Sequence, residues 1–151
     1  MAAERLKIAI DVTIDAATAG GVAQVALGLV HALGGLSEGN EEYLLIVQSE
    51  AEAEYFKPFI GPNQRLAKRP ALALAQRVGN RLQRTRDRIS NTAGETFVPS
   101  YSISDGFYES LGCEVIHFPH QRFVICGMPS IYNPHDVQHL HFPQFFKPRE
   151  L

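Results

Sequence analysis

The feature that most constrains the fold is a strand, a loop and an amphipathic helix that follow one another near the start of the chain. Residues 6–12 are apolar enough for a strand at the centre of a sheet. After Gly21, apolar residues recur at the spacing of one helix face, at Val22, Val25, Ala26, Leu29, Val30 and Leu33. Gly34 and Gly35 can end this helix. Such a β-loop-α unit predicts a parallel sheet.

The same alternation of strands and helices continues along the chain. Further strands are predicted at residues 43–47, 64–69, 114–118 and 130–133. Helices are predicted at residues 50–56, 71–89 and 104–111, and a polar loop at residues 91–100. The predicted fold class is therefore α/β, with a Rossmann-like, doubly wound parallel sheet in one domain.

Composition narrows the class of protein further. With 151 residues, 45% hydrophobic and 20% charged, the chain has enough apolar material for one soluble globular domain. A net charge of -2 gives no overall attraction to nucleic acid, so no nucleic-acid partner is expected. No apolar run approaches the roughly 18 residues of a membrane-spanning helix. The charged Glu4, Arg5 and Lys7 also argue against a secretory signal, and we predict a cytoplasmic protein whose Cys113 and Cys126 are reduced thiols.

Polar residues follow three of the predicted strands. In a parallel sheet the carboxyl ends of the strands meet at one edge, where open α/β proteins bind their ligands. The segments that end these strands and follow them are residues 11–13 with Gly20 and Gly21, residues 117–120, and residues 133–136. We therefore expect one functional site at this edge.

Gly20 and Gly21, directly before the first helix, are candidates for binding an anion such as phosphate. Glycine lets the backbone approach a ligand closely, and the first amides of a helix lack partners within the helix. The two glycines could equally form an ordinary tight turn. Neither the dinucleotide fingerprint GxGxxG nor the P-loop motif GxxxxGK[ST] is present.

His135 and Asp136 are the candidate catalytic pair, because they follow a strand directly. His135 could otherwise only stabilise its loop. With His139 and His141 it also has spacings that suit a transition metal, but no further ligand is reliably placed, so no metal site is predicted. These histidines are expected to stack against the nearby Phe142, Phe145 and Phe146.

Basic residues are concentrated in residues 77–88. On a helix, one stripe would carry Arg77, Arg81, Arg84 and Arg88, and another would carry Leu74, Val78, Leu82 and Ile89. This segment could make peripheral contact with an anionic membrane or hold an acidic acceptor. It could equally be an ordinary surface helix whose arginine stems cover apolar surface.

Several segments together resemble a known enzyme family. They are residues 7–11, 20–23, 115–119 and 132–136, followed by Gln138, His139 and residues 143–146. In this order they resemble the N-terminal domain of family-four retaining glycosyltransferases, which have the GT-B fold of two facing Rossmann-like domains. The resemblance covers most of the chain except about residues 70–100, and its most specific part is the His-Asp segment with the residues that follow.

The resemblance implies that residues 1–151 are the acceptor-side domain, one half of a GT-B fold. Gly20 and Gly21 would lie near the donor diphosphate, and His135 would approach the transferred sugar. In the complete enzyme, His120 and Asp136 would shape the acceptor side. No metal or other cofactor is implied. Nothing in the sequence corresponds to the C-terminal donor-binding domain. The expectation is therefore a fragment, a truncated reading frame or half of a split enzyme, inactive alone.

The predicted function is transfer of a hexose from a nucleotide-sugar donor to a hydroxyl of a saccharide or lipid-linked acceptor, with retention at the anomeric carbon. Two other classes of function stay open. One is a stand-alone ligand-binding or regulatory module with a Rossmann-like fold. The other is a metal-dependent hydrolase that uses His135, His139 and His141.

Overall fold

The computed structural model describes residues 5–13, 20–70, 102–120, 122–135 and 138–145. They belong to two compact units. The first combines Met1–Arg69 with Ser102–His135, and the second combines Pro70–Tyr101 with Asp136–Leu151. In the second unit the described elements are helix α4 (Gln138–His141) and the 3-10 helix η3 (Pro143–Phe145). All other described elements belong to the first unit.

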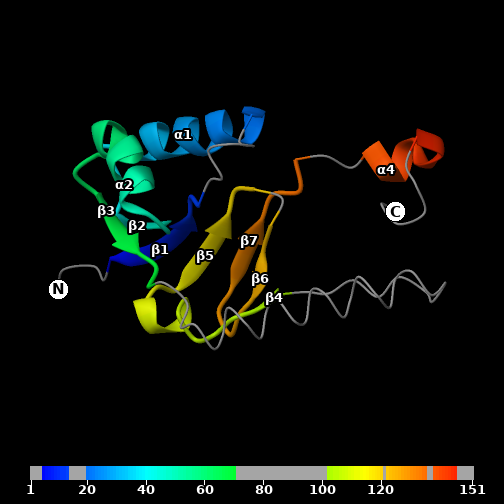
Figure 1. Ribbon diagram of the computed structural model, residues 1–151. Helices are drawn as coiled ribbons and strands as arrows, with labels where there is room; N and C mark the ends of the chain where they lie inside the picture. The colour runs from blue at the N-terminus through cyan, green and yellow to red at the C-terminus, as the bar shows by residue number, and fades with distance from the viewer. Residues whose placement is uncertain (1–4, 14–19, 71–101, 121, 136–137, 146–151) are drawn as a thin grey trace. The chain divides into compact units, whose positions relative to one another are not determined.

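The first unit is built on a parallel sheet of five strands (Figure 1). The strands are β1 (Leu6–Asp11), β2 (Glu41–Val47), β3 (Gln64–Lys68), β5 (Val115–Phe118) and β7 (Ser130–Tyr132). Their order in the sheet is β3-β2-β1-β5-β7, and each neighbouring pair is parallel. The chain thus extends the sheet on one side of β1 and then returns to add β5 and β7 on the other side. This arrangement confirms the predicted Rossmann-like α/β fold.

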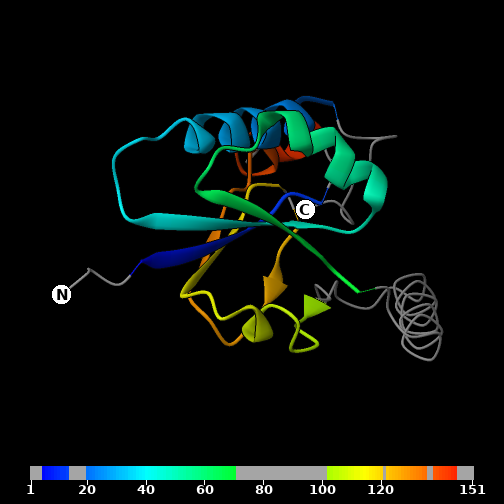
Figure 2. The same ribbon diagram turned by 90° about the vertical axis from the view of Figure 1, so that its left-hand side faces the viewer.

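Two helices cover one face of the sheet, α1 (Gly20–Gly34) and α2 (Glu50–Phe56) (Figure 2). A short 3-10 helix, η1 (Lys57–Phe59), continues from α2. The side chains of β1 alternate between the two faces, as the two-residue period of a strand requires. Ile10 and Val12 pack with Val30 of α1 in one core cluster, whereas Ala9 packs with Ile116 in a second cluster on the other face.

The C-terminal end of α1 is held against the turn before β3. The side chain of Gln64, only 5% exposed, donates to the carbonyl oxygen of Val30 at 2.8 Å and accepts from the Gly61 amide at 2.9 Å. Asn63 donates to the carbonyl oxygen of Leu33 at 3.1 Å. These bonds tie carbonyl groups near the C-terminal end of α1 to the turn before β3.

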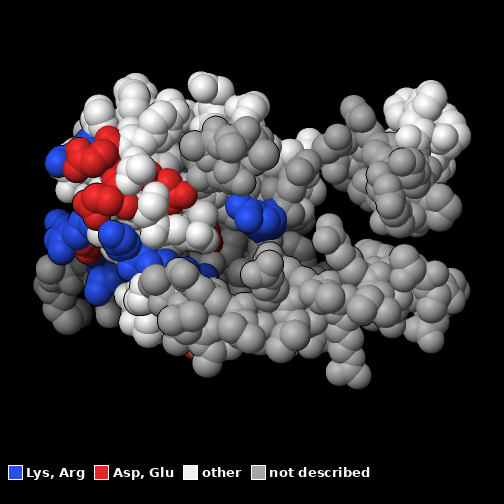
Figure 3. All heavy atoms as spheres, in the orientation of Figure 1, with Lys and Arg blue, Asp and Glu red and all other residues white. Residues whose placement is uncertain are grey.

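Charged side chains gather over α2 and β3 (Figure 3). Ion pairs join Lys57 to Glu54 at 3.1 Å, Arg65 to Glu42 at 3.0 Å, and Lys68 to Glu50 at 2.9 Å. Solvent screens most of these charges, so the pairs add little stability. The N-terminus of α2 is fixed more specifically, because Ser49 and Glu52 form a reciprocal capping box.

The prediction of a helix at residues 104–111 is wrong. Only η2 (Glu109–Leu111) is helical there, as a 3-10 turn. The side chains of Ser104 and Asp105 accept hydrogen bonds from the amides of Gly106 and Phe107, at 3.1 and 3.2 Å. Such local bonds compete with helical hydrogen bonding, and the φ of +88° at Gly106 also departs from a helix.

A second, two-stranded sheet was not expected from the sequence. It pairs β4 (Ser102–Ile103) with β6 (Val124–Ile125) in parallel. The other predicted strands and the helices at residues 50–56 and near residues 21–33 are confirmed within one or two residues at each end. The helix predicted at residues 71–89, its basic segment 77–88 and the loop at residues 91–100 lie outside the described residues. Among the helices that are described, none is long and apolar enough to cross a membrane.

The close contact between α1 and the turn before β3 makes a first testable prediction. A Cβ atom on Gly61 would collide with the carbonyl group of Gly34. We expect Gly61→Ala to lower the free energy of unfolding by about 1–3 kcal/mol, the usual cost of overpacking. Gly28→Ala is the matched control, because its added Cβ meets no atom within 4 Å. It should stabilise α1 by about 1 kcal/mol. Urea denaturation of both variants measures the two effects, and equal stabilities would contradict the assignment.

Candidate functional site

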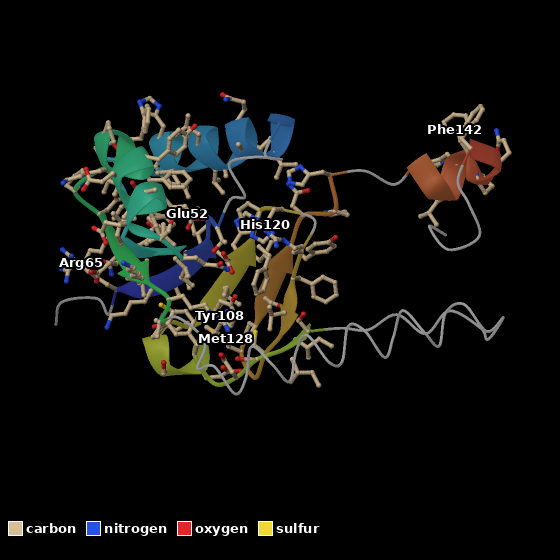
Figure 4. The ribbon with its side chains drawn as sticks, in the orientation of Figure 1. Glu52, Arg65, Tyr108, His120, Met128 and Phe142 are labelled. Carbon is tan, nitrogen blue, oxygen red and sulfur yellow. The ribbon has the colours of Figure 1, made fainter. Side chains whose placement is uncertain are left out.

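The candidate site lies where β1 and β5 end, side by side in the sheet. Here the direction in which the chain adds strands reverses, and such switch points are where doubly wound sheets bind ligands. Asp11 is the last residue of β1, and His120 follows β5 by two residues. Their side chains approach each other, with His120 Nε2 3.6 Å from Asp11 Oδ1. Figure 4 shows His120 beside the end of β5 and Tyr108 on the face of the sheet away from α1.

Asp11 is a buried carboxylate with two hydrogen-bond donors. It is only 6% exposed. The hydroxyl of Tyr108 donates to Oδ2 at 2.7 Å, and the amide of Thr13 donates to Oδ1 at 3.0 Å. Burial alone would raise the pKa of Asp11, but His120 and the bonds from Thr13 and Tyr108 together lower it. Asp11 is therefore ionised at neutral pH.

Arg69, directly after β3, supports Tyr108 from the other side. Its Nη1 donates to the Tyr108 hydroxyl at 2.9 Å, and its Nη2 lies 3.0 Å from both carboxylate oxygens of Asp105. The guanidinium also lies over the rings of Phe107 and Tyr108, 5.1 and 5.0 Å from their centroids. Burial and the charge of Asp11 raise the pKa of Tyr108, so its hydroxyl keeps its proton.

Three polar atoms near Asp11 are buried without a hydrogen-bond partner in the described part of the chain. They are the two ring nitrogens of His120 and the Oγ1 of Thr13. Buried polar atoms are usually hydrogen-bonded in native proteins. Nε2 faces Asp11, whereas a bound ligand with hydroxyl or other polar groups would satisfy Nδ1 and Oγ1. They are therefore the clearest sign of binding chemistry at this edge.

His135 stands at the exit of β7 in an unusual backbone conformation. Its φ of 57° lies in the left-handed region, which non-glycine residues seldom adopt outside constrained positions. Its Nε2 lies 2.7 Å from the carbonyl oxygen of Pro119, next to His120. Because a carbonyl only accepts, Nε2 carries the hydrogen of this bond. Nδ1 of the neutral ring is then an acceptor on an exposed side chain.

Gly20 and Gly21 are the first two residues of α1 and lie in its first turn. Figure 1 shows this turn on the side of the sheet where β1 and β5 end. A Cβ atom added to either glycine would meet no atom within 4 Å, so packing within the protein does not require glycine there. Only Gly20, with a φ of +31°, has a backbone that disfavours other residues. Space around the first amides of the helix is compatible with anion binding.

The other predicted residues are less informative. Asp136 lies outside the described residues, as does the side chain of His139, and His141 belongs to the second unit. Within the described ranges, no three His, Cys, Asp or Glu residues are arranged to hold a metal ion. Cys113 and Cys126 are free thiols, as predicted, although they are only half buried.

Sequence reasoning missed Tyr108 and Arg69, and it placed Asp11 at the expected edge without assigning it a specific role. A signal did exist, because an aspartate that ends a buried strand needs a partner. That partner could not be read from local spacing, since Tyr108 lies 97 positions from Asp11 and Arg69 lies 39 positions from Tyr108.

The ionised state of Asp11 predicts a pH effect on stability. Its lowered pKa in the folded protein contributes stability that is fully present above the ordinary value of 3.8. This contribution is lost as the pH falls below that value toward the lower pKa of the folded state. Asp11→Asn should therefore destabilise the protein at neutral pH, and the difference from wild type should shrink on acidification. Urea denaturation at a series of pH values measures it, and parallel curves would contradict the assignment.

Comparison with known proteins identifies no relative: no family model matches this sequence, and neither a curated protein nor a solved structure is similar to it.

Proposed function

We propose that this chain is the acceptor-side Rossmann-like domain of a retaining glycosyltransferase, which transfers a hexose from a nucleotide-sugar to a hydroxyl of a saccharide or lipid-linked acceptor. The observation that carries the proposal is the 2.7 Å contact of His135 Nε2 with the carbonyl oxygen of Pro119, the residue before His120, at the carboxyl edge of a parallel sheet. The sequence resemblance supplies the reaction class. The geometry supports it, because the edge of the sheet carries candidate contacts for the donor diphosphate, the transferred sugar and the acceptor.

The first turn of α1 is the proposed contact for the donor diphosphate. Its amides lack partners within the helix, and the helix dipole favours negative charge at this end. Charge develops on the diphosphate as the bond to the sugar breaks, so donors fixed in advance lower the barrier. The absence of side chains at Gly20 and Gly21 lets the phosphate oxygens reach the backbone.

His135 is the proposed contact for the transferred sugar. The bond to the Pro119 carbonyl fixes its ring, which leaves Nδ1 as an acceptor for a sugar hydroxyl. A side chain already held in place loses little conformational entropy when the sugar binds. The left-handed backbone at His135 is consistent with this role, since such conformations gather at binding sites.

His120 and Thr13 are the proposed contacts for the acceptor. Both have buried polar atoms without a partner among the described residues, and Asp11 places a negative charge beside them. Hydroxyl groups can satisfy such atoms as donors and as acceptors. The reaction proposed here uses no metal. In the resembled family a second Rossmann-like domain grips the nucleotide, so transfer requires a domain of that kind.

Titration of the 151-residue chain with UDP-glucose, GDP-mannose and ADP-glucose tests the proposal. We expect weak binding, with a Kd on the order of 1 mM, because the resembled family takes most donor contacts from its other domain. Shifts in NMR amide signals should centre on the first turn of α1. Saturable binding with a Kd of about 1 μM or less would favour a stand-alone binding module. If none of the three nucleotide-sugars binds, the proposed donor site is wrong.

Gly21→Val should weaken this binding at least about tenfold, a loss of about 1.4 kcal/mol, because a branched side chain would stand where the phosphate approaches. Gly28→Val is the matched control, with the same change on the same helix and with no atom within 4 Å of its Cβ. Calorimetric titration of the two variants compares them. Equal affinities would remove Gly21 from the site.

His135→Asn should weaken binding of the nucleotide-sugar and leave binding of the free nucleoside diphosphate unchanged. Asparagine tolerates the left-handed backbone, but it has no group at the position of Nε2, so it cannot reach the Pro119 carbonyl and its acceptor near the position of Nδ1 is no longer held in place. Loss of one hydrogen bond predicts a loss of about fivefold in affinity for the sugar-bearing ligand. His31→Asn, an exposed histidine near the far end of α1, is the control. An equal loss for both ligands would show that His135 only supports the fold.

A further inference from the structure

A network of interacting polar side chains extends through the first unit and ends at His120. Asp105 holds Arg69, Arg69 donates to the hydroxyl of Tyr108, and Tyr108 donates to Asp11. Tyr108 and Asp11 are both buried, with 1% and 6% of their surface exposed. The residues of this network come from the position after β3, from the segment before η2 and from the end of β1. Its last step, from Asp11 to His120, is the 3.6 Å approach across the switch point.

The hydrogen bonds in this network have only one possible direction. A guanidinium has donors and no acceptor, so the Tyr108 hydroxyl accepts from Arg69 and must give its own hydrogen to Asp11. Asp11 Oδ2 accepts this hydrogen bond. Oδ1 accepts from the Thr13 amide at 3.0 Å and still has a lone pair for His120. Asp11 can therefore take a hydrogen bond from His120 Nε2, and it has no hydrogen to give.

The charges favour the same arrangement. Arg69 and Asp105 neutralise each other, because Nη2 contacts both carboxylate oxygens, and this leaves Asp11 as a buried negative charge. A carboxylate in this environment favours an N–H group directed at it. At 3.6 Å the contact is longer than a hydrogen bond, but contacts of this kind commonly tighten when a ligand closes the site.

We propose that Asp11 and Tyr108 are positioning residues for a hydroxyl-binding site. They hold the His120 ring with Nε2–H toward Asp11, which leaves Nδ1 to accept a hydrogen bond from a hydroxyl of the bound sugar acceptor. Thr13, whose amide donates to the same carboxylate, also carries a buried hydroxyl without a partner among the described residues. The identity of the ligand as a sugar acceptor rests on the proposed function, whereas the orientation of the ring does not.

A purely structural role for Asp11 makes a different prediction. In that case Tyr108 and Thr13 satisfy the carboxylate, and the hydrogen of His120 can sit on either nitrogen. Nitrogen-15 NMR of histidine-labelled protein distinguishes the two, because the ring-nitrogen shifts report which nitrogen carries the hydrogen. It needs no ligand and no activity. At alkaline pH, where histidine is neutral, we expect His120 to carry its hydrogen on Nε2. A hydrogen on Nδ1 in the wild-type chain would overturn the proposal.

Asp11→Asn should change this tautomer. Asparagine lacks the negative charge that favours an N–H group on Nε2, so the histidine hydrogen should move to Nδ1, as loss of the carboxylate causes in other histidine-aspartate pairs. Tyr108→Phe keeps the carboxylate and should leave the tautomer on Nε2 but broaden the His120 signals, because Asp11 loses one of its supports. His31, an exposed histidine near the far end of α1, is the internal control and should be unchanged in both variants. An unchanged His120 in Asp11→Asn would show that Asp11 does not position it.

Binding probes separate this inference from the proposed function. Methyl α-glucoside, at the highest soluble concentration, represents the acceptor, and UDP represents the donor phosphates. We expect the glucoside to shift His120 Nδ1, and UDP to shift the amides of Gly20 and Gly21 instead. If His120 has the expected tautomer and responds to the glucoside while UDP has no effect, the donor site is wrong and the positioning pair stands. If the glucoside leaves Nδ1 unchanged, the hydroxyl-binding site is wrong.

Discussion

The buried carboxylate of Asp11, bonded by the Tyr108 hydroxyl, is the interaction on which the candidate site depends. A charge at the end of a central strand is costly to bury, and only donors in fixed positions make it acceptable. Tyr108 supplies one of these at 2.7 Å, and Arg69, which donates to the same hydroxyl, directs its hydrogen toward Asp11. One bond therefore ties the segment before η2 to the sheet and also fixes the charge beside His120.

The two faces of β1 explain how structure and function share one strand. Ile10 and Val12 pack under the helices, whereas Ala9 and Asp11 face the side that Tyr108 covers. Shifting the strand by one residue would exchange these faces and bury Asp11 under the helices without Tyr108. The pairing of β1 with β2 and β5 prevents such a shift. The register of the sheet thus protects the site.

Much of the fold could be predicted because its signals are local. The helix face that starts near Gly21 and the apolar runs of β2 and β5 are periodic over a few residues, so the order of strands and helices follows from the sequence. The segment at residues 104–111 was predicted wrongly, because two side chains bond the local backbone and turn it away from a helix. Of the site, the exits of the strands were predictable. The partners of Asp11 and the bond from His135 to Pro119 were not, since only tertiary folding brings them together.

The close contact between Gly34, at the end of α1, and Gly61, in the turn before β3, has a mechanical consequence for the opposite end of α1. With one end fixed by Gln64 and close backbone contact, the helix can adjust only by pivoting about that end. Its 15 residues make it about 22 Å long, so a tilt of about 3° moves the first turn by roughly 1 Å. That displacement is comparable with the difference between a loose contact and a good hydrogen bond. A small rotation at a firmly packed end would thus set how closely the first amides meet an anion, without disturbing the core.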